Sequence, residues 1–184
     1  MTAAVVLAAG GASRYAGGGH KLLASFRGRP LLAWAVEHAL AADIGPTLVV
    51  TGAVDISGVL PLDVTVVPNP EWRRGMAASI RAGLDWAARA GHEDVVLGLG
   101  DQPLVPASAW RAVAASKSPI AVATFGGERR PPVRLSAEVW PLLPHEGDVG
   151  ARSLMAARPE LVAEVPCEGE AADVDTVEDL ARWG

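Results

Sequence analysis

Cysteine, lysine and long apolar runs are all scarce in this chain of 184 residues. Cys167 is the single cysteine, which excludes an internal disulfide and leaves a buried structural thiol as the expected role. No stretch reaches the roughly 20 apolar residues that a membrane-spanning helix requires. The apolar N-terminal run has no basic region before it and stops at Ser13 and Arg14, so we expect no signal peptide. A cytoplasmic protein that does not contact the membrane is the natural expectation.

Basic residues are outnumbered and dispersed along the chain. The 16 lysines and arginines face 21 aspartates and glutamates, and the net charge is −5. Because lysine and arginine form no cluster, nucleic acid is not expected as the main partner. The length suffices to bury one full core and 50% of the residues are hydrophobic, so we predict a single domain over residues 1–184.

Apolar periodicity predicts strands that alternate with helices. The predicted strands span residues 5–7, 47–51, 64–67, 94–99 and 120–124. Predicted helices start at Pro30, after Gly75, at Pro106 and after Thr176. The second of these helices should have one apolar face, formed at four-residue steps by Met76, Ile80, Leu84 and Ala88. The alternation indicates an α/β fold with three layers, α/β/α, around a mostly parallel sheet whose ligands bind at the carboxyl ends of the strands.

A glycine-rich loop follows the first predicted strand and carries two cations. Gly10 and Gly11 end the apolar run, and Arg14 and Lys21 come after them. Glycine lets amide N–H groups approach a ligand and form an anion-binding nest, to which both cations would add charge. We interpret the loop as a triphosphate site; the alternative is a flexible glycine loop with solvated charges. The spacing fits neither the P-loop nor the Gly-x-Gly-x-x-Gly dinucleotide pattern.

Two carboxylates are candidate metal ligands. Asp101 comes directly after the fourth predicted strand, where a carboxylate suits Mg²⁺, an ion that combines a few carboxylates with triphosphate oxygens. The alternative is a turn aspartate that stabilises its own loop. Near the C-terminus, Thr176 and Asp179 form a capping pair for the last predicted helix. Asp175 lies just before this cap.

The order of these motifs resembles a known enzyme family over nearly the whole chain. Four segments carry the resemblance: Leu7-Ala8-Ala9-Gly10, the loop with Arg14 and Lys21, Gly100-Asp101-Gln102-Pro103, and Asp173-Val174-Asp175-Thr176. They are similar to small nucleotidyltransferases, above all to molybdenum cofactor cytidylyltransferases and their guanylyltransferase relatives. The first and third segments resemble the cytidylyl branch, whereas guanylyl relatives tend to have two glycines after the alanine.

The resemblance implies a Rossmann-like nucleotidyltransferase fold of the glycosyltransferase-A type. It implies Mg²⁺-dependent transfer of CMP from CTP to a phosphorylated acceptor, molybdopterin or molybdenum cofactor, with release of pyrophosphate. It implies catalytic roles for Arg14, Lys21 and Asp101, and metal ligation by Asp101 and Asp175. Implied nucleotide contacts are Leu7, Ala8, Ala9, Gly10, Gly11, Arg14, Lys21, Asn69, Gly75, Ser79 and Asp101. Implied acceptor contacts are Gln102, Arg130, Pro132, Asp148, Gly150 and Arg152.

Some of these segments also have simpler interpretations. Residues 69–79 resemble the segment that lines the nucleobase and ribose, yet Ser79 would equally suit a helix surface. Residues 129–134 and 147–152 resemble acceptor-side loops, although Asp148 would equally suit a helix N-terminus, where negative charge is favourable.

The chain departs from the family pattern at three points. Ala16 stands where the family usually has glycine, the spacing from Arg14 to Lys21 is longer than usual, and Pro131 replaces the histidine of a Gly-His-Pro segment. These departures affect acceptor identity more than nucleotide transfer. Within the enzyme class, the alternative is a guanylyltransferase or a sugar-phosphate nucleotidyltransferase of the same fold, with GTP as the possible nucleotide. The departures also leave open a non-catalytic accessory protein that carries cofactor to an apo-enzyme, in transient contact with a molybdoenzyme.

Overall fold

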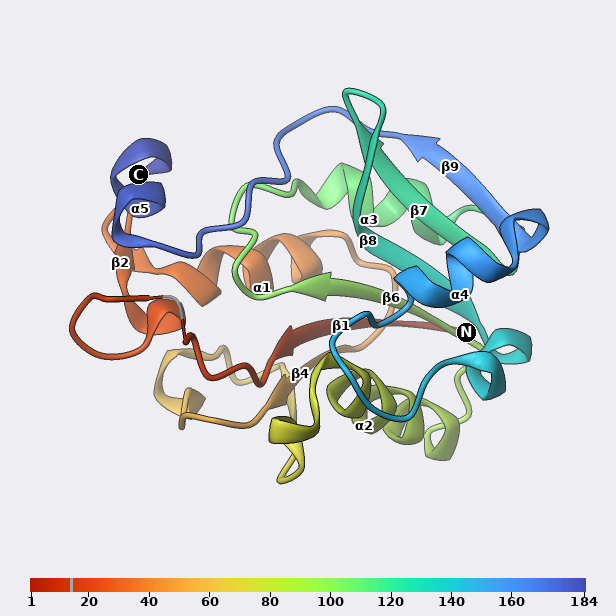
Figure 1. Ribbon diagram of the computed structural model, residues 1–184, viewed down its shortest axis with the longest axis horizontal. Helices are drawn as coiled ribbons and strands as arrows, with labels where there is room; N and C mark the ends of the chain where they lie inside the picture. Colours follow the sequence, from red (N-terminus) through yellow and green to blue (C-terminus); the bar gives the residue numbers. More distant parts are fainter. Residues whose placement is uncertain (14) are drawn as a thin grey trace.

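A seven-stranded sheet forms the centre of the computed structural model, which describes residues 1–13 and 15–184 (Figure 1). The strand order is β5-β4-β1-β6-β8-β7-β9. The strands are β1 (Thr2–Ala8), β4 (Thr47–Thr51), β5 (Thr65–Pro68), β6 (Asp94–Leu99), β7 (Ile120–Phe125), β8 (Glu128–Ser136) and β9 (Val162–Pro166). Every pairing is parallel except the two that β8 makes with β6 and β7. The mostly parallel sheet predicted from the sequence is therefore confirmed.

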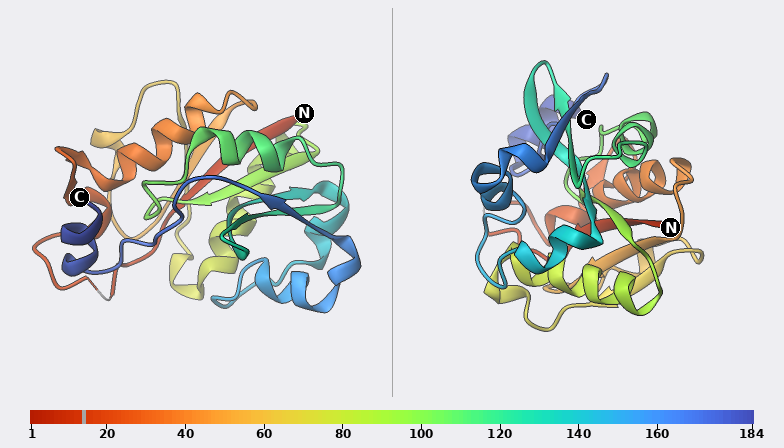
Figure 2. Two further views of the ribbon diagram at one scale, coloured as in Figure 1. Left: turned by 90° about the horizontal axis from the view of Figure 1, so that it is seen from above. Right: turned by 90° about the vertical axis from the view of Figure 1, so that its right-hand side faces the viewer.

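Helices cover both faces of this sheet, which gives the three layers (Figure 2, left). The α-helices are α1 (Leu31–Ala41), α2 (Met76–Arg89), α3 (Ala107–Ala114), α4 (Arg152–Ala157) and α5 (Val177–Trp183). Short 3₁₀ helices span Lys21–Leu23, Ser57–Val59, Trp72–Arg74, Ala137–Leu142 and Pro159–Leu161. Alternate residues of β1 reach the two cores, because side chains along a strand point to opposite faces. Val6 packs in the core beneath α1 and α3, and Val5 packs in the core beneath α2.

Helix α2 begins where predicted, but its buried face differs from the predicted one. Ile80 and Leu84 are buried, whereas Met76 is 37% exposed and Ala88 is exposed. Four-residue steps advance about 400° around a helix of 3.6 residues per turn, so each step drifts about 40°. The first and last residues of the pattern therefore leave the face that the two central residues share.

Helix α1 begins at Leu31 rather than at Pro30. The backbone of Pro30 is extended, with ψ of 138°, and the residue pairs with Ser25 in a small hairpin. The hairpin consists of β2 (Ser25–Phe26) and β3 (Arg29–Pro30), and its turn contains Gly28 at φ of 78°, a backbone region that favours glycine.

The prediction of a loop over residues 129–134 is wrong, because these residues belong to β8. Proline has no N–H to donate to a ladder, so Pro131 and Pro132 argued against a strand. The register changes at this point: Ala123 pairs with Arg130, but Val122 pairs with Val133. The two prolines lie at this irregularity, where regular pairing is already interrupted, so their missing N–H groups remove few hydrogen bonds between the strands.

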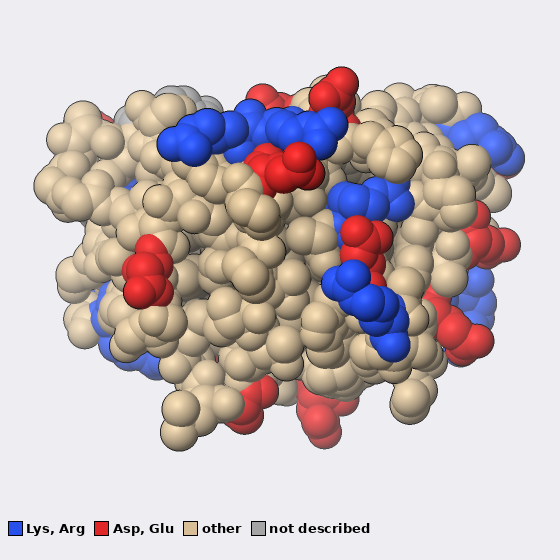
Figure 3. All heavy atoms as spheres, turned by 90° about the horizontal axis from the view of Figure 1, so that it is seen from below, with Lys and Arg blue, Asp and Glu red and all other residues tan. Residues whose placement is uncertain are grey.

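Cys167 is only partly buried, which differs from the expected buried thiol. Its S–H donates to the carbonyl of Val165, and burial raises the pKa of the thiol, which disfavours a reactive thiolate. Within residues 1–13 and 15–184, no helix combines the length and apolarity needed to cross a bilayer. On the face shown in Figure 3, basic and acidic side chains are interspersed, with uncharged surface between them.

Candidate active site

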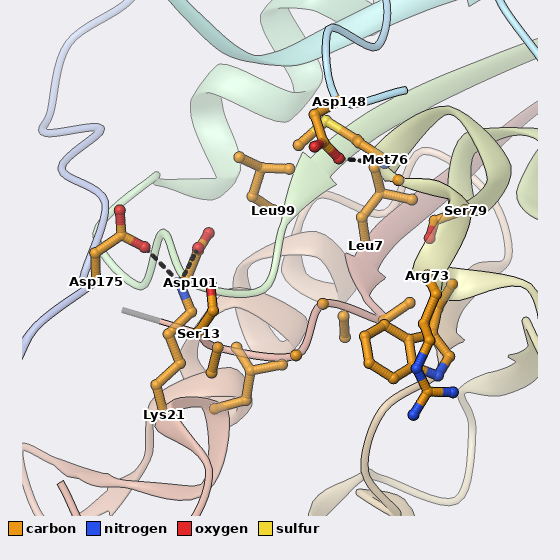
Figure 4. A pocket seen from close by; sticks show the side chains of 18 residues that line it. Leu7, Ser13, Lys21, Arg73, Met76, Ser79, Leu99, Asp101, Asp148 and Asp175 are labelled. Atoms are coloured by element: carbon orange, nitrogen blue, oxygen red, sulfur yellow. Dashed lines mark hydrogen bonds and ion pairs between the residues drawn. The ribbon is translucent and has the colours of Figure 1, made fainter. Parts of the chain in front are cut away.

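A cavity of about 550 Å³ opens where β1 and β6 end, at the edge of the sheet predicted to bind ligands (Figure 4). Lys21, Asp101 and Asp175 lie together at one end of it, with Ser79 and Arg73 at the other (Figure 4). Predicted nucleotide contacts that line the cavity are Leu7, Ala8, Ala9, Gly10, Gly11, Lys21, Gly75, Ser79 and Asp101. Lining residues that sequence reasoning missed include Ala12, Ser13, Leu22 and Leu99. Trp72, Arg73 and Met76 also line the cavity; they belong to the predicted nucleobase segment 69–79 but had no individual role.

Hydrogen bonds to the backbone shape the glycine-rich wall of this cavity. The amide of Gly100 donates to the carbonyl of Leu7 at 3.0 Å, and that of Ala53 donates to Ala9 at 3.1 Å. A ring nitrogen of His20 lies 2.9 Å from the carbonyl of Gly10, across the loop. The loop of Gly10 and Gly11 is thus anchored at both ends beside the carboxyl edge of the sheet.

Arg14, one of the predicted nucleotide contacts, lies outside the described residues. Asn69, another, does not line the cavity. Asn69 is buried behind the wall, where its side-chain amide donates to the hydroxyl of Ser79 at 3.0 Å. Asn69 therefore positions Ser79, and the alternative of Ser79 as a surface residue is wrong because Ser79 is only 6% exposed.

Trp72 and Arg73 form the wall opposite the glycine loop. The guanidinium of Arg73 lies 4.4 Å from the centre of the Trp72 ring, a cation–π contact. A Cβ on Gly11 would come within 3.0 Å of the Trp72 ring, so the loop approaches the ring closely at a residue without a side chain. An aromatic residue next to two arginines, within a segment already identified as a nucleobase segment, was the signal that could have pointed to this wall.

The ammonium of Lys21 lies between two carboxylates. It contacts Oδ2 of Asp101 at 2.6 Å and Oδ1 of Asp175 at 2.6 Å (Figure 4). The Lys21 side chain is 12% exposed. Burial lowers the pKa of Lys21, but the charges and hydrogen bonds of Asp101 and Asp175 outweigh it, so the pKa stands above its ordinary value. The two carboxylates predicted as metal ligands thus converge on one cation position.

Backbone contacts bring the C-terminal segment to this position. The amide of Val174 donates to the carbonyl of Asp101 at 3.0 Å, and Val174 itself is fully buried. Thr176 and Asp179 form the predicted capping box of α5, whose carboxylate also accepts from the amide of Asp175. The cap and the metal-ligand interpretation of Asp175 are therefore compatible, because the cap orients the backbone and leaves the Asp175 side chain toward the cavity.

The donor set at this position fits a divalent cation that is shared with a nucleotide. Oδ1 of Asp101 is buried and has no hydrogen-bond partner among the described residues, so it retains a free acceptor. Within residues 1–13 and 15–184, no three His, Cys, Asp or Glu side chains gather to hold a metal alone. Mg²⁺ suits such a site, because it is usually bound through one or two carboxylates together with phosphates and water.

A second cavity, of about 340 Å³, adjoins the first. Leu7, Met76, Leu99 and Asp148 line both cavities. Of the predicted acceptor contacts, those that line the second cavity are Gln102, Arg130, Asp148 and Arg152. Pro132 and Gly150 do not line it, whereas the neighbouring Pro131 and Val149 do.

Asp148 lies at a helix N-terminus, which agrees with one of its two sequence interpretations, and it also lines both cavities. Its Oδ1 accepts a hydrogen bond from the amide of Met76 at 3.2 Å, which places the charge at the N-terminus of α2. The amide of Ala77 donates to the carbonyl of Gly147, which fixes the same loop to α2. This docking forms the boundary between the two cavities.

Comparison with known proteins identifies the class of enzyme. The MobA-like NTP transferase domain matches residues 4–163, and the chain belongs to this family. The chain is 30% identical to a molybdenum cofactor guanylyltransferase of Cereibacter sphaeroides, over 96% of this chain and 93% of that protein. It is 31% identical to the nicotine blue oxidoreductase of Paenarthrobacter nicotinovorans, over 96% and 94% of the two chains.

The fold matches solved structures as well. Rv0371c of Mycobacterium tuberculosis is similar with a TM-score of 0.82 and 29% identity, over 98% of this chain and 96% of that chain. A second structure of that protein, in complex with manganese, matches with a TM-score of 0.77 at 28% identity, over 99% and 97%. Together with the cavity and its carboxylates, these matches define a nucleotidyltransferase.

Proposed function

We propose that this enzyme transfers CMP from CTP to the terminal phosphate of a molybdopterin-type acceptor and releases pyrophosphate. The observation that carries the proposal is the convergence of Asp101 and Asp175 on one cation position, 2.6 Å from the Lys21 ammonium and beside the Gly10 loop. Phosphoryl chemistry of this kind depends on positioning and on charge neutralisation rather than on a covalent protein step.

The first cavity would hold the nucleotide. Amides of the Gly10 loop, with Lys21, would bind the β- and γ-phosphates and stabilise the departing pyrophosphate. Arg14 would add a second cation there. Ser79 and Arg73 lie toward the end of the cavity away from the carboxylates, where ribose and base would fit (Figure 4). The Trp72 ring, which contacts Arg73, lines the same cavity.

Asp101 and Asp175 would hold Mg²⁺. When bound, the ion supplies positive charge against the phosphate oxygens. Lys21 would then move toward the triphosphate, because the ion at the carboxylates would repel the ammonium group next to it. Support for a divalent ion comes from the free acceptor on Asp101 and from the similar protein solved with manganese.

The second cavity would receive the acceptor. Arg129, Arg130 and Arg152 supply donors suited to an anionic group, and apolar side chains from β6, β8 and α2 line the rest. The cavities share a boundary at Leu7 and Asp148, which allows the acceptor phosphate to approach the nucleotide.

CTP is our proposed donor, because Ala9 occupies the position where guanylyl relatives tend to have glycine. Ala9 lines the first cavity, where its methyl group would reduce the space for a base relative to glycine. The similarity to molybdenum cofactor guanylyltransferases favours GTP as the second candidate.

The test is a pyrophosphate-release assay with molybdopterin-type acceptor, Mg²⁺ and either CTP or GTP. We expect release with CTP at several times the rate with GTP, and none from the Asp101→Asn variant. Faster release of pyrophosphate with GTP would show that the enzyme is a guanylyltransferase and not a cytidylyltransferase. Binding of nucleotide without any release in the presence of acceptor would support a carrier protein instead.

A further inference from the structure

Neighbouring residues of the same two segments serve different cavities. Asp101 and Asp175 line the first cavity, whereas Gln102 and Asp173 line the second. Asp173 therefore lies two residues from a proposed metal ligand but faces the proposed acceptor site. No motif assigned it a role of its own.

Asp173 has two partners in the second cavity. Its Oδ1 accepts from the side-chain amide of Gln102 at 2.8 Å, and its Oδ2 pairs with Arg130 at 3.3 Å. Gln102 is 2% exposed, so it is a fixed support for the carboxylate. The Asp173 side chain remains 35% exposed, which leaves lone pairs on both oxygens within reach of a ligand.

A carboxylate is out of place in a site that binds only an anion. Three arginines line this cavity, and an acceptor with negative groups alone would be repelled by Asp173. A ligand that brings N–H donors would satisfy the carboxylate, and the apolar walls formed by Ile80 and Val122 suit a flat ring.

We propose that Asp173 is a specificity-determining residue that recognises adjacent N–H donors on a heterocyclic acceptor, such as an amino-pyrimidinone edge. This inference rests on the proposed function, in that the second cavity receives the acceptor, and it adds the residue that recognises the heterocyclic end of that acceptor.

The test compares two pteridines that differ at a single donor. The probes are 6-hydroxymethylpterin and 6-hydroxymethyllumazine, which has a carbonyl where the pterin has its 2-amino group. By calorimetry, the wild-type protein should bind the pterin roughly tenfold or more tightly, the usual effect of one hydrogen bond to a charged group. Asp173→Asn presents a donor in place of an acceptor and should bring the ratio of the two affinities close to one. Asp173→Ser is a second variant with the same expectation.

Glu128→Gln is the matched control. Glu128 pairs with Arg130 at 3.3 Å, as Asp173 does, but it does not line the cavity. If Asp173 acts only by holding Arg130, Glu128→Gln and Asp173→Asn will change the ratio of the two pteridine affinities equally, and the proposal is overturned. Equal binding of both probes by the wild-type protein, or binding of neither, would also overturn it.

Titration of CTP with the same samples separates this inference from the proposed function. If the protein binds CTP but does not distinguish the two pteridines, the proposed role of Asp173 is wrong and the proposed nucleotide site is retained. If it distinguishes the pteridines but does not bind CTP, the role of Asp173 is retained and CTP is not the donor.

Discussion

Asp101 and Asp175 each place a carboxylate oxygen 2.6 Å from the same ammonium group, that of Lys21, although they belong to distant segments of the chain. The contact of Val174 with the Asp101 backbone sets this geometry. Two carboxylates held together at the end of a buried strand create a strong local preference for a cation. The enzyme therefore has a preformed position for positive charge next to the loop that we propose for the triphosphate.

Replacing Lys21 by alanine should affect both turnover and folding. We expect turnover to fall roughly 10²–10³-fold, the usual loss for one preorganised charge-stabilising group. A loop lysine is ordinarily dispensable for stability, but this one is 12% exposed, and its loss leaves two carboxylates facing each other. Unfolding in urea should show a loss on the order of 3 kcal/mol, partly restored by Mg²⁺. Lys117→Ala, at the other lysine of the chain, which is exposed, is the control. Unchanged kinetics in Lys21→Ala would place Lys21 outside the reaction.

Ala9→Gly should relax the choice between nucleotides. Removal of a buried methyl group from the cavity wall enlarges the base site, and one methyl or methylene in a pocket is worth roughly 1 kcal/mol or a little more. Calorimetric titration of CTP and GTP in the presence of Mg²⁺ should show the CTP preference reduced by about that amount. Tighter binding of GTP than of CTP by the unmodified protein would refute the premise of this prediction.

Gly75→Ala should disturb the boundary between the cavities. Gly75 has φ of 99°, and a Cβ there would lie 2.6 Å from the backbone of Gly147. We expect a loss of stability of roughly 1–3 kcal/mol and weaker binding of both nucleotide and acceptor. Gly91→Ala is a matched control, because Gly91 has φ of 76° but open space around it. Equal losses of stability and binding in the two variants would mean that the close approach of Gly75 to the backbone of Gly147 has no specific effect.

The stability of the protein should depend on His38 in mildly acidic solution. Burial lowers the pKa of His38 below its ordinary value of 6.5, despite the opposing charge of Glu37. The unfolded chain therefore binds the proton more tightly, so the contribution is complete above pH 6.5 and is lost as the pH falls through that value toward the folded pKa. Urea unfolding between pH 7.5 and 5 should show a smaller decline in His38→Gln than in the wild-type protein. His145→Gln, at an exposed histidine, should follow the wild-type curve.

The sequence predicted the parallel half of the sheet well, because β1, β4 and β6 are apolar runs bounded by glycine, proline or charge. It missed β8, since two prolines concealed the strand, and it missed β9, an edge strand whose residues are mostly half-buried or exposed. Local patterns cannot reveal the contact that brings the C-terminal segment to Asp101, because that contact is made by the backbone. The position of Asp173 in the second cavity also emerged only from the fold, because its contacts with Gln102 and Arg130 join distant segments of the chain.

A structure of the enzyme with CTP and Mg²⁺ is the decisive measurement for the shared metal position. We predict one ion held by carboxylate oxygens of both Asp101 and Asp175 at about 2.1 Å, with the Lys21 ammonium on the triphosphate. Both carboxylates well beyond that distance and unconnected to the ion through bound water would contradict it. So would a Lys21 that stays between the carboxylates while the nucleotide is bound.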